Sequence, residues 1–196
     1  MNTIIKESDY DDYLEIGIDS GQTFSQINCK NKTSVDNNPD SNADYMTTSD
    51  LFFELAYSKT LLFDIIFIDG NHDYEYVKRD IKNSLRHLRP SGIIFTHDTL
   101  PRHISETHSD GSRGMGTAYK GIMDLRMNNP DVVICSLDLA NYPDVDEGVG
   151  VSVIIKGAQS CYESLDLNWS NYQKHKHKLM NILPFTDFKE WFNVNL

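Results

Sequence analysis

The sequence is short of basic residues and cysteines, and each shortage excludes a class of function. Lysine and arginine number 18 against 29 aspartate and glutamate, which gives a formal net charge of −11. A surface of that charge repels phosphate backbones, so no nucleic-acid partner is expected. Cys29, Cys135 and Cys161 are scattered and odd in number, without the C-x-x-C spacing of a zinc knuckle or the pairing of a disulfide framework. This cysteine pattern indicates a reducing compartment.

The chain also lacks a long apolar run. No stretch is long enough to cross a bilayer, and no signal peptide is recognisable before the first expected strand. We therefore expect no membrane association and a cytoplasmic location. The 196 residues are 39% hydrophobic and 24% charged, which suits one compact domain with a real core.

Strand and helix patterns alternate along the chain. The expected strands cover residues 13–18, 33–36, 63–69, 93–97, 132–137 and 149–156, and the expected helices cover 21–27, 50–57, 74–88 and 117–127. Ser49 is the expected N-cap of the second helix, and Pro90-Ser91-Gly92 is the expected end of the third. The pattern predicts an α/β fold, a doubly wound Rossmann-like sheet of about seven mostly parallel strands. No helix separates the last two strands, so they are expected to pair antiparallel.

The chain is expected to divide near Gly157. Residues 1–157 would form the main domain, and residues 158–196 a helical tail that packs on this domain or on a partner subunit. A homodimer is therefore one of the open alternatives. The run of lysine and histidine at 174–178 is interpreted as a solvated helix face.

The most informative stretch is an apolar strand that runs into a loop marked by Glu15, Gly17 and Gly21. Glycine lets the backbone bend sharply and lets a ligand approach closely. The loop is not a phosphate cradle, because no lysine follows Gly21. It is not the dinucleotide fingerprint either, because Asp19 occupies the position of the second glycine. An acidic, glycine-bent loop suits a ligand with a positive or neutral face, such as S-adenosylmethionine.

Polar residues follow the other expected strands as well. Asp36 lies about 20 residues after Gly17, where nucleotide-binding sheets place the acid that binds ribose hydroxyls. Ser49 and Asp50 stand at the start of the next helix. The two later strands end in Asp69-Gly70-Asn71-His72 and in His97-Asp98-Thr99. Because ligands bind beyond the carboxyl ends of such strands, these residues predict one site.

Asp69, His72 and Asp98, with His97, are the catalytic candidates. An imidazole titrates near neutral pH and can take a proton from a hydroxyl group. Two carboxylates with water and a substrate oxygen would suit Mg²⁺. The alternative that these side chains only cap turns and a helix stays open. Residues 101–116 are expected to form a polar loop over the substrate site.

These residues together resemble a class I S-adenosylmethionine-dependent methyltransferase. The resemblance runs over residues 13–157 and rests on the E-x-G-x-x-x-G loop, on Asp36 and on the closing antiparallel pair. The stretches TSDLFF, FIDGNHDY and HDTLP are similar to the Methyltransf_24-like group. The resemblance implies that Glu15, Gly17 and Gly21 line the methionine and ribose. It also implies that Asp36 holds the ribose hydroxyls, Ser49 and Asp50 border the adenine, and Asp69 closes the pocket.

A looser resemblance connects the chain to metal-dependent sugar and macrolide O-methyltransferases. It implies that Asp69 and Asp98 bind magnesium and that His72 is the base, whereas His97 stands where those enzymes have a carboxylate. The implied activity is O-methylation of a small-molecule acceptor such as a sugar or glycan precursor. Two alternatives stay open, an NAD-binding oxidoreductase and a catalytically inactive cofactor-fold binding module.

Overall fold

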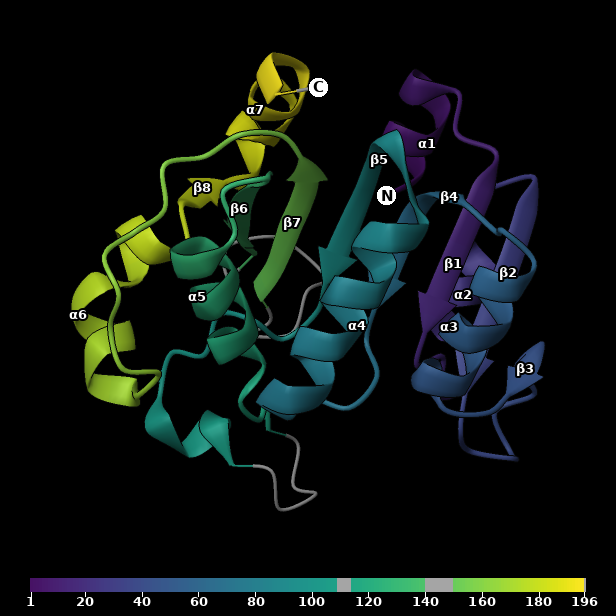
Figure 1. The fold of residues 1–196 in the computed structure, drawn as a ribbon, viewed down its shortest axis with the longest axis horizontal. Coiled ribbons are helices and arrows are strands. Elements are labelled where there is room, and N and C mark those ends of the chain that lie inside the picture. Colours follow the sequence, from purple (N-terminus) through teal and green to yellow (C-terminus); the bar gives the residue numbers. More distant parts are fainter. Residues whose placement is uncertain (109–113, 140–149, 196) are drawn as a thin grey trace. The chain divides into compact units, whose positions relative to one another are not determined.

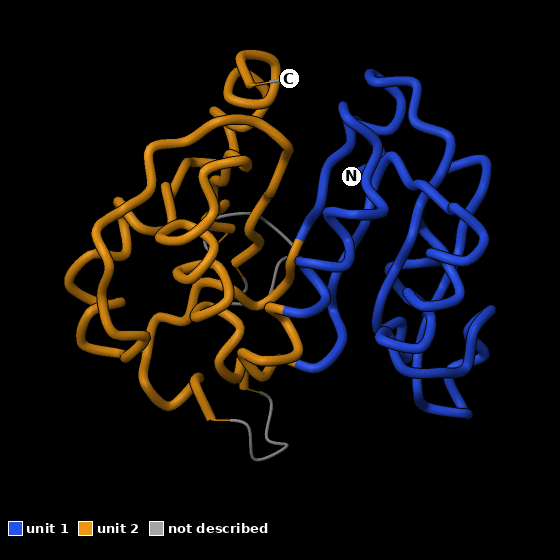
Figure 2. The backbone as a smooth tube through the Cα atoms, viewed as in Figure 1, with its two compact units in different colours: residues 1–71, 79–95 blue, residues 72–78, 96–196 orange. Residues whose placement is uncertain are grey.

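The computed structural model describes residues 1–108, 114–139 and 150–195. The chain groups into two compact units (Figure 2), of which unit 1 is Met1–Asn71 with Arg79–Phe95 and unit 2 is His72–Lys78 with Thr96–Leu196. Figure 1 labels the helices and strands along the chain. In chain order the elements are α1 (Asn2–Ser8), β1 (Asp12–Ile16), α2 (Gln22–Gln26), β2 (Asn31–Asp36), β3 (Tyr45–Met46), α3 (Ser49–Ser58), β4 (Phe63–Ile68), α4 (Tyr74–His87), β5 (Leu88–Thr96), η1 (Ile104–Thr107), α5 (Ala118–Asn128), β6 (Val132–Asp138), β7 (Gly150–Lys156), α6 (Trp169–Leu179), β8 (Ile182–Pro184), η2 (Phe185–Asp187) and α7 (Phe188–Asn195).

Unit 1 is built on strands in the order β3-β2-β1-β4-β5. The central strand β1 runs parallel to β2 on one side and to β4 on the other. Both β1 and β4 are almost entirely buried, as expected for parallel strands that are covered on both faces. The chain adds strands on one side of β1 and then crosses to β4 on the other side. Such a reversal leaves a crevice at the carboxyl ends of β1 and β4, where α/β sheets bind their ligands.

Unit 2 contains strands in the order β7-β6-β8. Strands β6 and β7 pair antiparallel over seven residue pairs, from Val132–Lys156 to Asp138–Gly150. Helix α6 packs on α5 through a cluster of three aromatic rings, in which Tyr119 lies 4.7 Å from Tyr172 and 6.1 Å from Trp169 between ring centroids. The Tyr172 hydroxyl also donates to the carbonyl of Pro101 at 3.0 Å. This cluster and the Tyr172 hydrogen bond fix the segment that follows β5 against helix α6.

The α/β fold with a mostly parallel sheet and a closing antiparallel pair is confirmed. The number of strands differs, because eight are present among the described residues and about seven were expected. The short strand β3 and the strand β8, which runs parallel to β6, have no clear apolar pattern of their own. The division near residue 157 stays a prediction.

Two predicted boundaries were wrong. The N-cap of α3 is Thr48, not Ser49, because the Thr48 hydroxyl accepts the hydrogen bond from the Leu51 N–H. Pro90-Ser91-Gly92 does not precede β5 but lies inside it. Pro90 and Ser91 are in the exposed first part of the strand, where a missing N–H is tolerated. Gly92 allows the strand to pass close to Asp64, since a Cβ there would lie 2.8 Å from the Asp64 carbonyl oxygen.

Within the described part of the chain, no helix has the length and apolar character that a membrane span requires. All three cysteines are free thiols, and Cys135 is buried in the core.

Candidate active site

The glycine loop after β1 is held directly against the end of β4. Gly17 has a φ of 82°, and its N–H donates to the Val35 carbonyl at 2.8 Å. A Cβ on Gly17 would lie 2.3 Å from the carbonyl oxygen of Asp69. Only glycine satisfies both the positive φ and this close approach. Gly17 and Asp69 therefore belong to one rigid part of unit 1.

The carboxylate of Asp36 fixes the shape of the same loop. Its Oδ2 atom accepts from the N–H groups of Ile18 at 2.9 Å and Asp19 at 3.0 Å. Its Oδ1 atom accepts from the Asn38 N–H at 2.8 Å. An ionised carboxylate has about four acceptor positions, so roughly one is left for a ribose hydroxyl.

Gly21 ends the loop as the N-cap of α2, with a φ of 72°. No atom lies within 4 Å of the place where its Cβ would be. The left-handed backbone, and not a close neighbour, is what requires glycine at this position.

Glu15 is the penultimate residue of β1, and its side chain is buried in unit 1. It is 1% exposed, and the Tyr13 hydroxyl donates to its Oε2 atom. Burial raises the pKa of Glu15 to about 7, and the negative charge of Asp69 adds to this effect. The Tyr13 hydrogen bond and the charge of Lys32 act in the opposite direction. Burial therefore favours the neutral form of Glu15, and its contact with the donor stays a prediction.

Ser49 and Asp50 begin α3, and side chains from α4 hold them. The Arg79 guanidinium pairs with the Asp50 carboxylate at 3.2 Å. The buried carboxyl of Asp80 is hydrogen-bonded to Ser49, and burial raises the pKa of Asp80 to about 6. The start of α3 is therefore held by one ion pair and one hydrogen bond to side chains of α4.

In unit 2, His72 and Asp98 form a close pair. The His72 Nδ1 atom lies 3.3 Å from Asp98 Oδ2, and the two side chains are 25% and 17% exposed. The other carboxylate oxygen of Asp98 lies 3.4 Å from His97 Nδ1. Asp98 has a φ of 55°, a left-handed conformation that is unfavourable for a residue with a Cβ. Such strain persists only where the surroundings hold it, and it clusters at functional sites.

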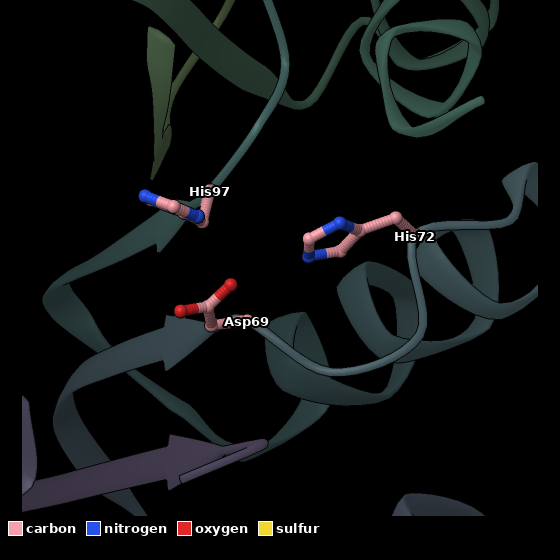
Figure 3. Close-up of side chains that lie close together, drawn as sticks. All are labelled: Asp69, His72 and His97. Carbon is pink, nitrogen blue, oxygen red and sulfur yellow. The ribbon is translucent and has the colours of Figure 1, made fainter. Parts of the chain in front are cut away.

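Asp69 and His72 belong to one short loop between β4 and α4. Three residue steps of extended chain span about 10 Å, so covalent geometry alone keeps the two residues near each other. Among the described residues, Asp69, His72 and His97 each offer one potential metal ligand, and these atoms lie within 4.8 Å of one another (Figure 3). The oxygens of Asp98 face the two imidazoles, and its role as a metal ligand stays a prediction.

The sequence did not single out Thr117 as a site residue. A threonine directly before a helix is normally an N-cap, but the Thr117 hydroxyl forms no bond with its own helix α5. Its oxygen accepts from the Tyr74 N–H at 2.7 Å, at the start of the helix that follows His72. No pattern in the sequence could have shown this contact. The predicted loop at 101–116 is only partly described, because residues 109–113 lie outside the described residues.

Part of the chain matches a known family model. Residues 14–99 match the profile of a family described as "Methyltransferase domain". That range contains every predicted cofactor-binding and catalytic residue of the chain. No curated protein matches the sequence.

Comparison with solved structures identifies the fold. An O-methyltransferase from Bacillus cereus in complex with SAH superimposes with a TM-score of 0.58 at 14% identity, over 79% of this chain and 78% of that one. The O-methyltransferase TomG from Streptomyces achromogenes, involved in tomaymycin synthesis and in complex with SAM, gives 0.55 at 14% identity, over 79% and 77%. The SAH-bound methyltransferase PaMTH1 from Podospora anserina gives 0.50 at 20% identity, over 79% and 75%.

Proposed function

We propose that this chain is a class I S-adenosylmethionine-dependent methyltransferase, and that it methylates an oxygen of a small hydroxylated acceptor such as a sugar or glycan precursor. The observation that carries the proposal is the pairing of His72 Nδ1 with Asp98 Oδ2 at 3.3 Å. A half-buried imidazole that is oriented by a carboxylate is the arrangement expected for a general base.

The donor would bind at the carboxyl ends of the unit 1 strands. Gly17 and Gly21 would give the methionine and ribose room beside the loop, and Asp36 would accept from a ribose hydroxyl. Ser49 and Asp50 would border the adenine, and Asp69 would close the pocket at the end of β4. The proposal is supported by the contacts that shape the loop, because a transferred group has to be held in a defined orientation.

His72 would take the acceptor proton. With Asp98 facing Nδ1, the favoured neutral tautomer has its proton on Nδ1, which leaves the Nε2 lone pair for the hydroxyl. S-adenosylmethionine, when bound, would supply an electrophilic methyl group and a neutral thioether leaving group. His72 Nε2 would accept the proton of the acceptor hydroxyl, and Asp98 would stabilise the resulting imidazolium.

The ligand atoms of Asp69, His72 and His97, taken as one group, fit Mg²⁺ poorly. Mg²⁺ prefers oxygen ligands in an octahedral arrangement. The group Asp69, His72 and His97 would supply two nitrogens and one oxygen, a set that suits zinc and other transition metals. The two carboxylates predicted as ligands, Asp69 and Asp98, therefore do not act as an oxygen pair in our proposal, and methyl transfer proceeds through His72 without a metal step.

Charge and composition narrow the proposed partners. A formal charge of −11 supports a small neutral or weakly charged acceptor over a nucleic acid. Free thiols support a reducing location such as the cytoplasm. The homodimer stays a prediction.

Two measurements test the function. Calorimetric titration with S-adenosylhomocysteine and with NAD should give binding only for the first, and binding only of NAD would favour an oxidoreductase. Transfer of a labelled methyl group to a panel of monosaccharides, nucleotide sugars and phenols should then identify the acceptor class. His72→Ala should lower kcat at least 100-fold without changing cofactor affinity, as is typical for loss of a general base (about 10²–10⁴).

The matched control is His177→Ala, an exposed histidine on α6. It should leave both quantities unchanged. An unchanged kcat in His72→Ala would remove His72 from the mechanism. Failure to bind S-adenosylhomocysteine would instead support an inactive binding module.

A further inference from the structure

The hydroxyl of Thr117 forms no hydrogen bond with the helix that it precedes. Thr117 is the N-cap residue of α5, yet its side chain makes no capping bond there. Its oxygen lies 2.7 Å from the Tyr74 N–H, one of the N–H groups in the first turn of α4 that have no partner within that helix. The threonine at the N-terminus of α5 thus accepts the hydrogen bond of an N–H group at the N-terminus of α4.

The backbone of Thr117 binds the other side of the same turn. Its N–H donates to the His72 carbonyl at 2.9 Å. Because Tyr74 and His72 flank Asp73, Thr117 holds the chain on both sides of that residue with two short hydrogen bonds. The main chain of His72 cannot shift without breaking one of them.

Gly116 closes the remaining space next to His72. It has a φ of 55°, and a Cβ on it would lie 2.8 Å from the His72 carbonyl oxygen and 3.0 Å from the His72 Cβ. A larger residue at this position would have to displace His72 itself. The imidazole at the far end of the side chain meets Asp98 at 3.3 Å.

We propose that Gly116 and Thr117 are positioning residues, which hold His72 in the orientation needed to take the acceptor proton. The inference rests on the function proposed above, since it concerns the alignment of the same base. Main-chain contacts from Thr117 fix where the side chain starts, and Asp98 fixes where the ring ends. A misplacement of about 1 Å in such a group can lower a rate about 100-fold, so two hydrogen bonds far from the reacting atoms can decide turnover.

The test compares Thr117→Val with Thr117→Ser. Valine keeps the shape and the backbone N–H but removes the oxygen that accepts from Tyr74, whereas serine keeps that oxygen. We expect Thr117→Val to lower kcat at least tenfold and to move the pH profile of kcat, with KM for S-adenosylmethionine unchanged. Thr117→Ser should restore kcat to within about twofold.

A control separates positioning from general stability. Asn168 caps α6 in the same unit through a 2.9 Å bond to the Asn171 N–H, and it makes no described contact with His72. Asn168→Ala should lower the unfolding temperature without moving the pH profile. The NMR signal of the His72 ring should shift in Thr117→Val but not in Asn168→Ala, a readout that does not require activity.

The outcomes distinguish the two ideas. If His72→Ala abolishes turnover while folded Thr117→Val and Gly116→Ala keep the wild-type kcat and His72 signal, the positioning role is wrong and the base stands. If Asn168→Ala reproduces every change seen in Thr117→Val, the effect is one of stability and the inference also fails. If His72→Ala leaves turnover unchanged, the proposed function itself fails.

Discussion

Gly17→Ala and Gly21→Ala should differ sharply in cost, although the two glycines lie in one loop and share a positive φ. Gly17 has a φ of 82° and Gly21 a φ of 72°. For alanine, a left-handed conformation costs about 1–2 kcal/mol at either position. The difference arises from what surrounds each new Cβ.

At Gly17 the added carbon would lie 2.3 Å from the Asp69 carbonyl oxygen and 2.5 Å from the Gly70 Cα, whereas ordinary contacts begin near 3.4 Å. The neighbouring atoms are backbone, so they cannot rotate away, and the loop must separate from the end of β4. Overpacking of this kind typically costs about 1–3 kcal/mol more. At Gly21 nothing lies within 4 Å, so no such cost is added.

We therefore expect Gly17→Ala to lower the free energy of unfolding by about 2–5 kcal/mol and Gly21→Ala by about 1–2 kcal/mol. Urea unfolding followed by circular dichroism measures both values. Calorimetry with S-adenosylhomocysteine should show a much greater loss of affinity in Gly17→Ala than in Gly21→Ala. Equal destabilisation by the two substitutions would refute the close approach of the loop to β4.

Three further predictions concern the acids and the metal-ligand group. The pKa of Glu15 is raised to about 7, above its unfolded value of about 4.3, so its neutral form is favoured by folding. Its contribution of roughly 3 kcal/mol to the free energy of unfolding is complete below about pH 4 and is lost as the pH rises through 7. Urea unfolding of Glu15→Gln at several pH values should lack this loss. A pH dependence of the variant equal to that of the wild type would contradict the prediction. Asp36→Asn should destabilise the protein by about 1.5–3 kcal/mol, because it weakens the hydrogen bonds from the Ile18 and Asp19 N–H groups, and it should weaken S-adenosylhomocysteine binding. Wild-type values in urea unfolding and in calorimetry would count against the role of Asp36 in holding the loop and the donor. Zn²⁺ should inhibit methyl transfer because it binds the His72 nitrogen, whereas Mg²⁺ should not inhibit. His97→Ala should relieve the inhibition by Zn²⁺. Stimulation of methyl transfer by Mg²⁺ would contradict this prediction.

The fold was predictable wherever local patterns are strong. The apolar run of β4 and the strand leading into Gly17 identify buried parallel strands, because only such strands are apolar on both faces. The strands β3 and β8 were not predictable, since two or three residues show no periodicity. The N-cap of α3 was displaced by one residue because Thr48 and Ser49 are both good caps, and only the geometry selects between them.

In the candidate site, too, the positions of the residues were predictable and their contacts were not. Asp36, Asp69, His72 and Asp98 were predictable because each follows a strand, and parallel strands end at a common edge. Their contacts were not predictable. That Asp36 binds loop amides and that Asp98 faces two imidazoles depends on which atoms meet in space.

The sequence by itself determined the chemical groups that are available: an acidic glycine loop, acids at the strand ends and histidines after two of the strands. These features are local, because residue type and spacing along a strand decide them. The tertiary structure alone decided how the groups are held. Glu15 is an internal acid whose pKa burial raises, and Thr117 binds both sides of the turn that carries His72. Both facts depend on contacts between residues far apart in the chain or on burial, and neither is encoded in any local pattern.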